Sequence, residues 1–187
     1  MDETVAFTRM ADGTREEYEM LARKFETCYR ALPDNVLAML KHLGGDKLGY
    51  QVDRLEHSLQ TATRAFRDGA DEETVTMALL HDIGDSLAPE NHAELAAAVL
   101  RPYVSEANLW VVQHHGIFQG YYYFHHIGAD RNARDKYRGH PHFQRCADFC
   151  ARWDQVSFDP AYDAMPLAAF EPMVRRLFAR KPFAYGN

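Results

Sequence analysis

The sequence predicts an all-α protein in which residues 1–187 form a single helical domain. Apolar residues recur at spacings of three and four through nearly the whole chain, which is typical of amphipathic helices. Capping residues precede many of these stretches and glycines follow several of them. Alternating patterns long enough for β-strands are absent, as are repeats and Pro/Gly-rich linkers. A chain of 187 residues can bury one sizeable core but is short for two domains.

Helix-capping residues, prolines and glycines divide the chain into about seven or eight predicted helices. The first begins at Thr14, which stands three residues before Glu17 as in a capping box, and ends before Pro33. A second is expected from Asp34 to the glycine pair at Gly44. The remaining helices are expected within residues 53–69, 71–84, 89–104, 105–123, 140–157 and 166–181, with a charged, aromatic loop between 123 and 140.

Composition excludes several classes of function. The formal net charge is −6, which argues against nucleic acid or an anionic membrane as the main partner. No apolar run approaches the roughly 20 residues of a membrane span, and the acidic N-terminus lacks an apolar signal core, so a cytoplasmic protein is expected. The three cysteines have no CxxC spacing, which argues against a disulfide framework and against a thiolate zinc site. The sequence does not indicate an oligomeric state.

Histidine and aspartate residues stand on, or at the ends of, five of the predicted helices. The segment "TVTMALLHDIGD" ends an apolar helix with adjacent His and Asp, and burying this pair is costly unless a partner satisfies both groups. Imidazole and carboxylate together suit zinc, iron, nickel or manganese. The candidate ligands are His57, His81, Asp82, His92, His115 and Asp154.

The pattern H…HD…H…H…D resembles the HD-domain superfamily over about Gly49 to Asp159. That resemblance implies a helical bundle around a metal centre, with a core signature of His57, His81, Asp82 and Asp154. The segments "VDRLEHSLQTATRA", "ALLHDIGD", "NHAELAAAVL" and "HHGIFQGYYY" are similar to the mixed-valent diiron oxygenases that break carbon–phosphorus bonds (the PhnZ and TmpB kind), and more distantly to inositol oxygenase.

The resemblance implies a centre of two irons, Fe(II) and Fe(III), with dioxygen as co-substrate. Asp82 would bridge the metals, and His92 and His115 would complete the iron at which dioxygen reacts, which makes these three the candidate catalytic residues. His114 competes with its neighbour His115 for this role. His115 is preferred because the segment after it then lines up best with the pocket segment of the family.

The ammonium end of a substrate is expected near an aromatic group. The resemblance places Tyr50 where a relative has a glutamate that faces the substrate amine, and Lys47 where that relative has a tyrosine. An aromatic ring there suits a methylated ammonium, which aromatic faces bind by cation–π attraction. The run Gly120–Phe124, with Tyr121, is a candidate for further walls of this site; the other interpretation of such a run at the end of a helix is core or interface packing.

The phosphonate end is expected to use other residues than in the relatives. Gln119 stands where a relative has a phosphonate-binding lysine, and Asp85 stands where several have a substrate-contacting histidine. Asp85 is therefore either a substrate residue or an exposed loop acid. The basic patch at 130–138, with Arg134 and Arg138 as the chosen candidates, is the expected source of positive charge because a guanidinium binds phosphonate oxygens bidentately. The patch also contains Arg131 and Lys136, and a solvated surface face is the other interpretation.

The resemblance predicts an oxygenase that cleaves a 1-hydroxy-2-(amino or trimethylamino)ethylphosphonate and releases phosphate with glycine or glycine betaine. Its expected partner is thus a small-molecule phosphonate. The alternative is a metal-dependent HD phosphohydrolase that acts on a nucleotide or another phosphoester through metal-activated water. A third reading is a metal-stabilised binding module without turnover.

Overall fold

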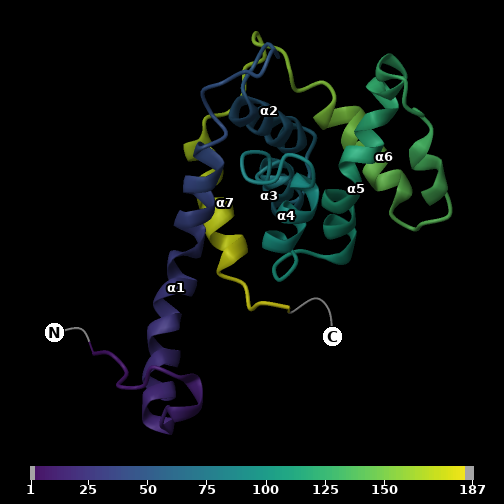
Figure 1. Cartoon of the computed structure of the whole chain (residues 1–187). Helices are drawn as coiled ribbons and strands as arrows, with labels where there is room; N and C mark the ends of the chain where they lie inside the picture. The colour runs from purple at the N-terminus through teal and green to yellow at the C-terminus, as the bar shows by residue number, and fades with distance from the viewer. Residues whose placement is uncertain (1–2, 184–187) are drawn as a thin grey trace.

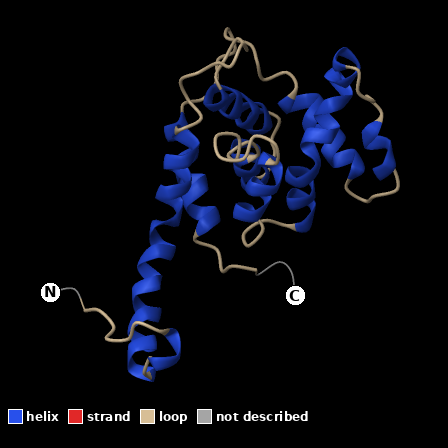
Figure 2. Cartoon of the chain, viewed as in Figure 1, coloured by secondary structure: helices blue, strands red, loops and turns tan. Residues whose placement is uncertain are grey.

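The computed structural model describes residues 3–183, and within that range every regular element is helical (Figure 2). The predicted all-α class is thereby confirmed. Helices α2 to α6 form a bundle, and α7 packs beside α1 and α3 at its edge (Figure 1). The α-helices are α1 (Arg15–Lys41), α2 (Arg54–Arg67), α3 (Glu72–Leu80), α4 (His92–Leu100), α5 (Glu106–Tyr123), α6 (Phe143–Phe149) and α7 (Leu167–Phe178).

Four of the helices begin where the sequence places a capping side chain. Thr14 and Glu17 form the expected capping box of α1, and the side chains of Asp53, Asp71 and Ser105 accept hydrogen bonds from the backbone of α2, α3 and α5. Each cap satisfies backbone N–H groups that have no partner within the helix. These caps fix where the helices that carry the candidate ligands start.

The expected break at Pro33 is wrong, because α1 continues through it to Lys41. A proline inside a helix removes one backbone hydrogen bond and costs about 3 kcal/mol. Here Pro33 is itself buried, and Val36, Leu37 and Leu40 on the following turns pack into the core. Burial of those side chains offsets the missing bond, so α1 remains one helix that extends from the bundle out to Arg15 (Figure 1).

Short irregular helices replace two expected features. The segment between α5 and α6 is not a plain loop, since it contains 3-10 turns η2 (Phe124–Ile127) and η3 (Ala133–Tyr137). The helix expected over 140–157 starts later, at Phe143, and passes at its end into a π-helical turn, η4 (Cys150–Asp154). A further 3-10 turn, η1 (Met10–Asp12), precedes α1.

The turn after α3 brings the start of α4 back toward its end. Helix α3 stops at Leu80 rather than at Gly84, so His81 is its C-cap and Asp82 lies in the turn that follows. A Cβ atom on Gly84 would lie 2.5 Å from the carbonyl oxygen of His92. Only a residue without a side chain allows this approach, which places the first residue of α4 beside the His-Asp pair.

Candidate metal centre

Five of the six candidate ligands are buried side chains that converge from different elements. His57 lies on α2, His81 and Asp82 follow α3, His115 lies on α5, and Asp154 closes the π-helical turn. The sixth, His92, begins α4, and its side chain is 22% exposed. Single π-helical turns are frequent at functional sites, and this one presents Asp154 to His57 of α2 and to His81 at the end of α3.

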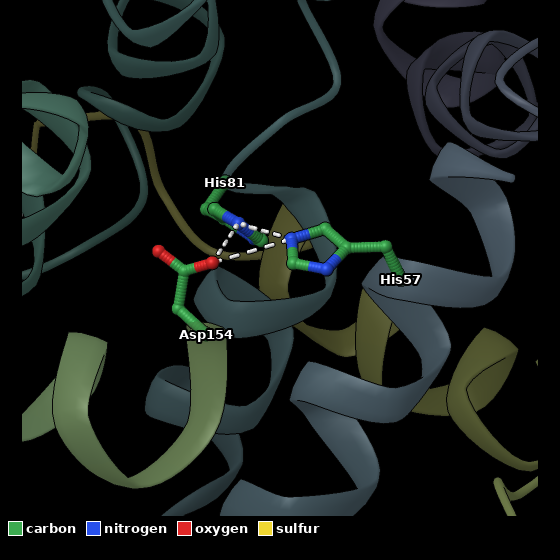
Figure 3. A group of neighbouring side chains, drawn as sticks. All are labelled: His57, His81 and Asp154. Atoms are coloured by element: carbon green, nitrogen blue, oxygen red, sulfur yellow. Dashed lines mark hydrogen bonds and ion pairs between the residues drawn. The ribbon is translucent and has the colours of Figure 1, made fainter. Parts of the chain in front are cut away.

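The first group consists of His57, His81 and Asp154, whose side chains point toward one another (Figure 3). The Nε2 atoms of the two histidines lie 3.3 Å apart, and Asp154 Oδ1 lies 3.3 Å from the first and 3.7 Å from the second. Each histidine uses Nδ1–H as a donor to a backbone carbonyl, that of Ser157 at 3.0 Å and that of Ala78 at 2.8 Å.

These hydrogen bonds fix the chemistry of the group. Because Nδ1 carries the proton, a neutral imidazole presents the lone pair of Nε2, and two such lone pairs 3.3 Å apart repel unless a proton or a cation lies between them. The second carboxylate oxygen, Asp154 Oδ2, is buried without a hydrogen-bond partner among the described residues. Nitrogen and oxygen donors of this kind suit a first-row divalent metal, so the residues fit a metal ion.

A second group faces the other side of Asp82. The Nε2 atoms of His92 and His115 lie 3.2 Å apart, and both approach Asp82 Oδ1, at 3.3 Å and 3.0 Å. His115 donates from Nδ1 to the carbonyl of Val112 at 2.7 Å, whereas the Nδ1 of His92 lies 3.1 Å from Asp85 Oδ1. Such outer partners orient a histidine toward a metal and raise its basicity.

Asp82 lies between the two groups with one oxygen toward each. Its Oδ2 atom is 3.4 Å from the Nε2 atoms of both His57 and His81, and its Oδ1 atom faces His92 and His115. A carboxylate in this position can bind one cation through each oxygen. The arrangement could therefore hold a cation on each side of this single aspartate.

The electrostatics of the site favour positive charge. Burial alone would raise the pKa of Asp82, but the charge of His81 and hydrogen bonds with His115 and His57 hold it well below its usual value. Burial likewise opposes the shift at Asp154, and hydrogen bonds with the two histidines again lower its pKa. Burial lowers the pKa of His57, yet the two carboxylates outweigh that effect and raise it to about 9. Without a metal, a proton on His57 supplies the cation that the carboxylates require.

A cavity of about 380 Å³ opens onto both groups. Its volume suits a small organic molecule. Arg54 is the one lysine or arginine among the described residues that line it. Beyond the ligands His57, Asp82, His92, His115 and Asp154, the lining residues are Tyr50, Arg54, Gly116, Gln119, Tyr122, Tyr123, Gln155 and Phe158.

Two of the predicted substrate residues line this cavity. Tyr50 stacks on Phe158 with ring centroids 5.2 Å apart, and Phe158 in turn stacks on His57 at 4.4 Å. Gln119 donates from Nε2 to Asp154 Oδ1 at 3.1 Å, while its own Oε1 is buried without a partner among the described residues. Both side chains are thus placed where a bound molecule would contact them.

The structure does not bring the other predicted substrate residues to the cavity wall. Tyr121 points away because it lies on another face of α5, where the guanidinium of Arg134 covers its ring at 3.8 Å. Arg138 is exposed and pairs with Asp135 at 2.9 Å. Asp85 lies just behind the wall, where it joins His92 to Arg54.

The sequence interpretation missed Arg54, and within the run Gly120–Phe124 it singled out Tyr121 where Tyr122 and Tyr123 line the cavity. Arg54 stands three residues before His57, so both lie on one face of α2. Tyr122 and Tyr123 stand seven and eight residues after His115, which is the spacing that repeats one helix face. Helical periodicity from the ligands was therefore the signal for these residues. His114, by contrast, leaves the site and stacks on Trp110 with ring centroids 4.1 Å apart.

One comparison with known proteins, with a family model, agrees with this geometry. No helix in residues 3–183 combines the length and apolar character that crossing a bilayer requires. A comparison with curated proteins finds no match to the chain. The family model described as "HD domain" matches residues 54–156, a range that contains all six candidate ligands. A cluster of His and Asp side chains able to hold metal within such a domain indicates a metal-dependent enzyme. Since the match covers more than half of its residues, the chain belongs to the HD-domain family.

Proposed function

We propose that this protein is a diiron oxygenase that cleaves the C–P bond of a 1-hydroxy-2-(amino or trimethylamino)ethylphosphonate. The observation that carries the proposal is the position of Asp82, whose two oxygens face different pairs of histidines. A single-metal hydrolase needs only the group of His57, His81, Asp82 and Asp154. The added pair, His92 and His115, supports a second metal position beside the first, because their Nε2 atoms lie 3.2 Å apart.

The donor set fits two irons. Histidine nitrogens and carboxylate oxygens are ordinary ligands of iron, and Asp154 Oδ2 offers a further oxygen without a partner in the protein. His57, His81 and Asp154 would hold one ion, His92 and His115 the other, and Asp82 would join them. When bound, the irons would supply the activation of dioxygen and the exchange of electrons with the substrate.

Arg54 is the residue we assign to the phosphonate group. Its guanidinium lines the cavity, and one of its Nη atoms lies 3.5 Å from Asp82 Oδ2, so an anion held there would adjoin the metal positions. Guanidinium binds phosphonate oxygens in a bidentate manner. This assignment replaces the basic patch at 130–138, whose Arg134 and Arg138 do not line the cavity.

The aromatic side of the cavity suits the ammonium end. Tyr50, Tyr123 and Phe158 line it together, with Tyr50 and Phe158 already stacked. Ring faces attract a cation, and a trimethylammonium gains more from them than a primary amine, which prefers a hydrogen-bond acceptor. Gln119 Oε1 is a buried acceptor of this kind, available to a hydroxyl or an amine.

The overall reaction balances with dioxygen as the only oxidant. One molecule of 1-hydroxy-2-aminoethylphosphonate and one of dioxygen give one glycine and one phosphate: the C–P and C–H bonds of the hydroxyl-bearing carbon break, that carbon becomes a carboxyl carbon, and oxygen is reduced. The chain's own contribution is to hold the phosphonate at Arg54, to orient the carbon between the two ends, and to exclude bulk water from a largely buried centre.

The test measures dioxygen consumption and phosphate release together on protein loaded with iron. Equal amounts of both, with the amino or the trimethylamino compound, are expected; the ratio of kcat/KM between the two compounds then identifies the ammonium group. Low-temperature electron paramagnetic resonance of partly reduced protein should show a coupled Fe(II)/Fe(III) signal that changes with substrate. His115→Ala should abolish both, while the matched variant His114→Ala should retain them. Release of phosphate from a phosphoester without dioxygen consumption would instead establish the hydrolase.

A further inference from the structure

The N-terminal part of α1 is a stalk that stands clear of the bundle (Figure 1). All nine residues from 22 to 30 are exposed, and Tyr29 and Arg30 approach the bundle only across a cavity that they share with Tyr103 and Phe178. Isolated helices of such length are marginal in water, because helical stability in proteins comes mostly from tertiary packing. The stalk therefore lacks the contacts that ordinarily keep a helix folded.

An apolar stripe runs along the stalk. Phe25 is 56% exposed and Tyr29 is 67% exposed, and Cys28 lies between them on the surface. The series Leu21, Phe25, Cys28 and Leu32 alternates spacings of four and three, which is the a/d pattern of a two-helix seam. Tyr29 flanks this series, and Leu32, at its inner end, packs against the core of the bundle. Exposed aromatic residues on a regular seam are typical of a surface that another helix covers.

A folded hook ends the stalk. Residues 3–14 turn back on the start of α1, where Ala6 N donates to Glu17 at 2.7 Å, Tyr18 donates to the carbonyl of Met10, and the rings of Phe7 and Tyr18 lie 5.4 Å apart. The N-terminal segment thus packs on itself at the hook, and its inner end joins the bundle, whereas residues 22–30 between them are exposed.

Charge along this arm, residues 3–30, is divided in a way that suits a second copy. Residues 3–19 contain five acidic and two basic residues, a net charge of −3, whereas residues 20–30 contain three basic and one acidic residue, a net charge of +2. Two such arms side by side in antiparallel order place the acidic tip of one along the basic stem of the other. A parallel pair would instead oppose like charges and bring the two bundles together at the same end (Figure 1).

The geometry points to an antiparallel pair of α1 arms as the contact between two copies of this chain, with Phe25 and Tyr29 at its centre. The contact is isologous, since the same stripe is contributed by both copies. The contact does not depend on the proposed reaction.

Light scattering after size exclusion measures the mass of the full chain at tens of micromolar. The expected value is twice the 21.5 kDa of one chain. The double variant Phe25→Glu/Tyr29→Glu should give one chain's mass. The control Ile127→Glu, which adds one negative charge at a side chain that is 68% exposed on η2, should leave the mass of the pair unchanged. A wild-type protein with the mass of one chain would overturn the inference, as would a double variant that remains paired.

If the double variant misfolds, the distance between labels on Cys28 of two copies tests whether the α1 arms pair. Cys28 is exposed and the other two cysteines are buried, so a spin label attaches selectively to Cys28 in the otherwise unaltered chain. Adjacent helix axes lie about 8–10 Å apart. Paired arms should therefore give a label-to-label distance within about 30 Å by dipolar spectroscopy. Absence of any distance in this range would show that the copies do not meet along α1.

Discussion

The Nε atom of Arg54 lies 2.5 Å from Asp85 Oδ2, and this ion pair links the cavity wall to the second group of ligands. Asp85 uses its other oxygen to face Nδ1 of His92 at 3.1 Å. One carboxylate thus holds both the residue assigned to the phosphonate and a ligand of the proposed second metal. The acid expected either to contact substrate or to lie exposed in a loop instead positions two other side chains.

Replacing Arg54 should weaken phosphonate binding selectively. Hydrogen bonds to charged groups contribute about 1.5–3 kcal/mol, so Arg54→Gln is expected to raise KM for the phosphonate by about 10- to 100-fold. Steady-state kinetics on iron-loaded protein check this, with Arg67→Gln as the control because Arg67 lies on the same helix outside the cavity. An unchanged KM would show that the phosphonate binds elsewhere.

Asp85→Asn should reduce the affinity of the second metal position more than that of the first. The amide keeps the size of the carboxylate but removes the negative charge beside His92, and loss of such an outer partner typically costs 10- to 100-fold in metal affinity. Metal content after dialysis should fall from about two ions per chain toward one. The surface variant Asp135→Asn should keep both ions, and equal content in the two variants would count against the role given to Asp85.

Metal-free protein should lose stability as the pH rises from about 6.5 to about 9. The pKa of His57 is raised to about 9 in the folded state, so the folded protein holds this proton more tightly than the unfolded chain does. That contribution is complete below pH 6.5 and is lost as the pH passes through 9, at most about 3 kcal/mol. Urea denaturation at several pH values measures it. Metal-loaded protein is the control, since the metal replaces the proton; a metal-free protein with no such loss would contradict the electrostatic picture.

Gly84→Ala should disturb the second group of ligands. The added Cβ would meet the backbone of His92, which cannot yield as a flexible side chain would. Overpacking of this kind costs about 1–3 kcal/mol, measured as a fall in the free energy of unfolding, and we expect a loss of the second metal with it. Gly139→Ala is the matched control because a Cβ there meets nothing within 4 Å. Equal stability of both variants would show that the turn adjusts freely.

The sequence predicted most of the helices because they follow from local signals, and it predicted the clustering of the six His and Asp residues through the resemblance to the HD-domain superfamily. Caps and apolar periodicity depend on neighbours within one or two turns, and the HD pattern is carried by spacing. The continuity of α1 through Pro33 could not be predicted, because it depends on burial against residues distant in sequence. The role of Asp85 was open for the same reason: its partner Arg54 lies 31 residues away in the chain.

The choice among the tyrosines at the end of α5 shows a different limit. Composition marks the run Tyr121–Tyr123 as aromatic without saying which ring faces the cavity. The face of α5 that points toward the cavity decides which ring lines it, and the position of His115 identifies that face. Once His115 is known to be a candidate ligand, helical spacing places Tyr122 and Tyr123 on the same face of α5 and Tyr121 on another face.

The π-helical turn at Cys150–Asp154 makes the length of this segment as important as its composition. A π-helical turn accommodates one residue more than an α-helical turn, and each residue of an α-helix rotates the chain by about 100°. If the same residues were regular α-helix, Asp154 would swing to another face and leave His57 and His81 without their carboxylate. Local irregularity is here a requirement of the centre, so substitutions that make this stretch a better helix would gain stability in the helix while dismantling the metal position.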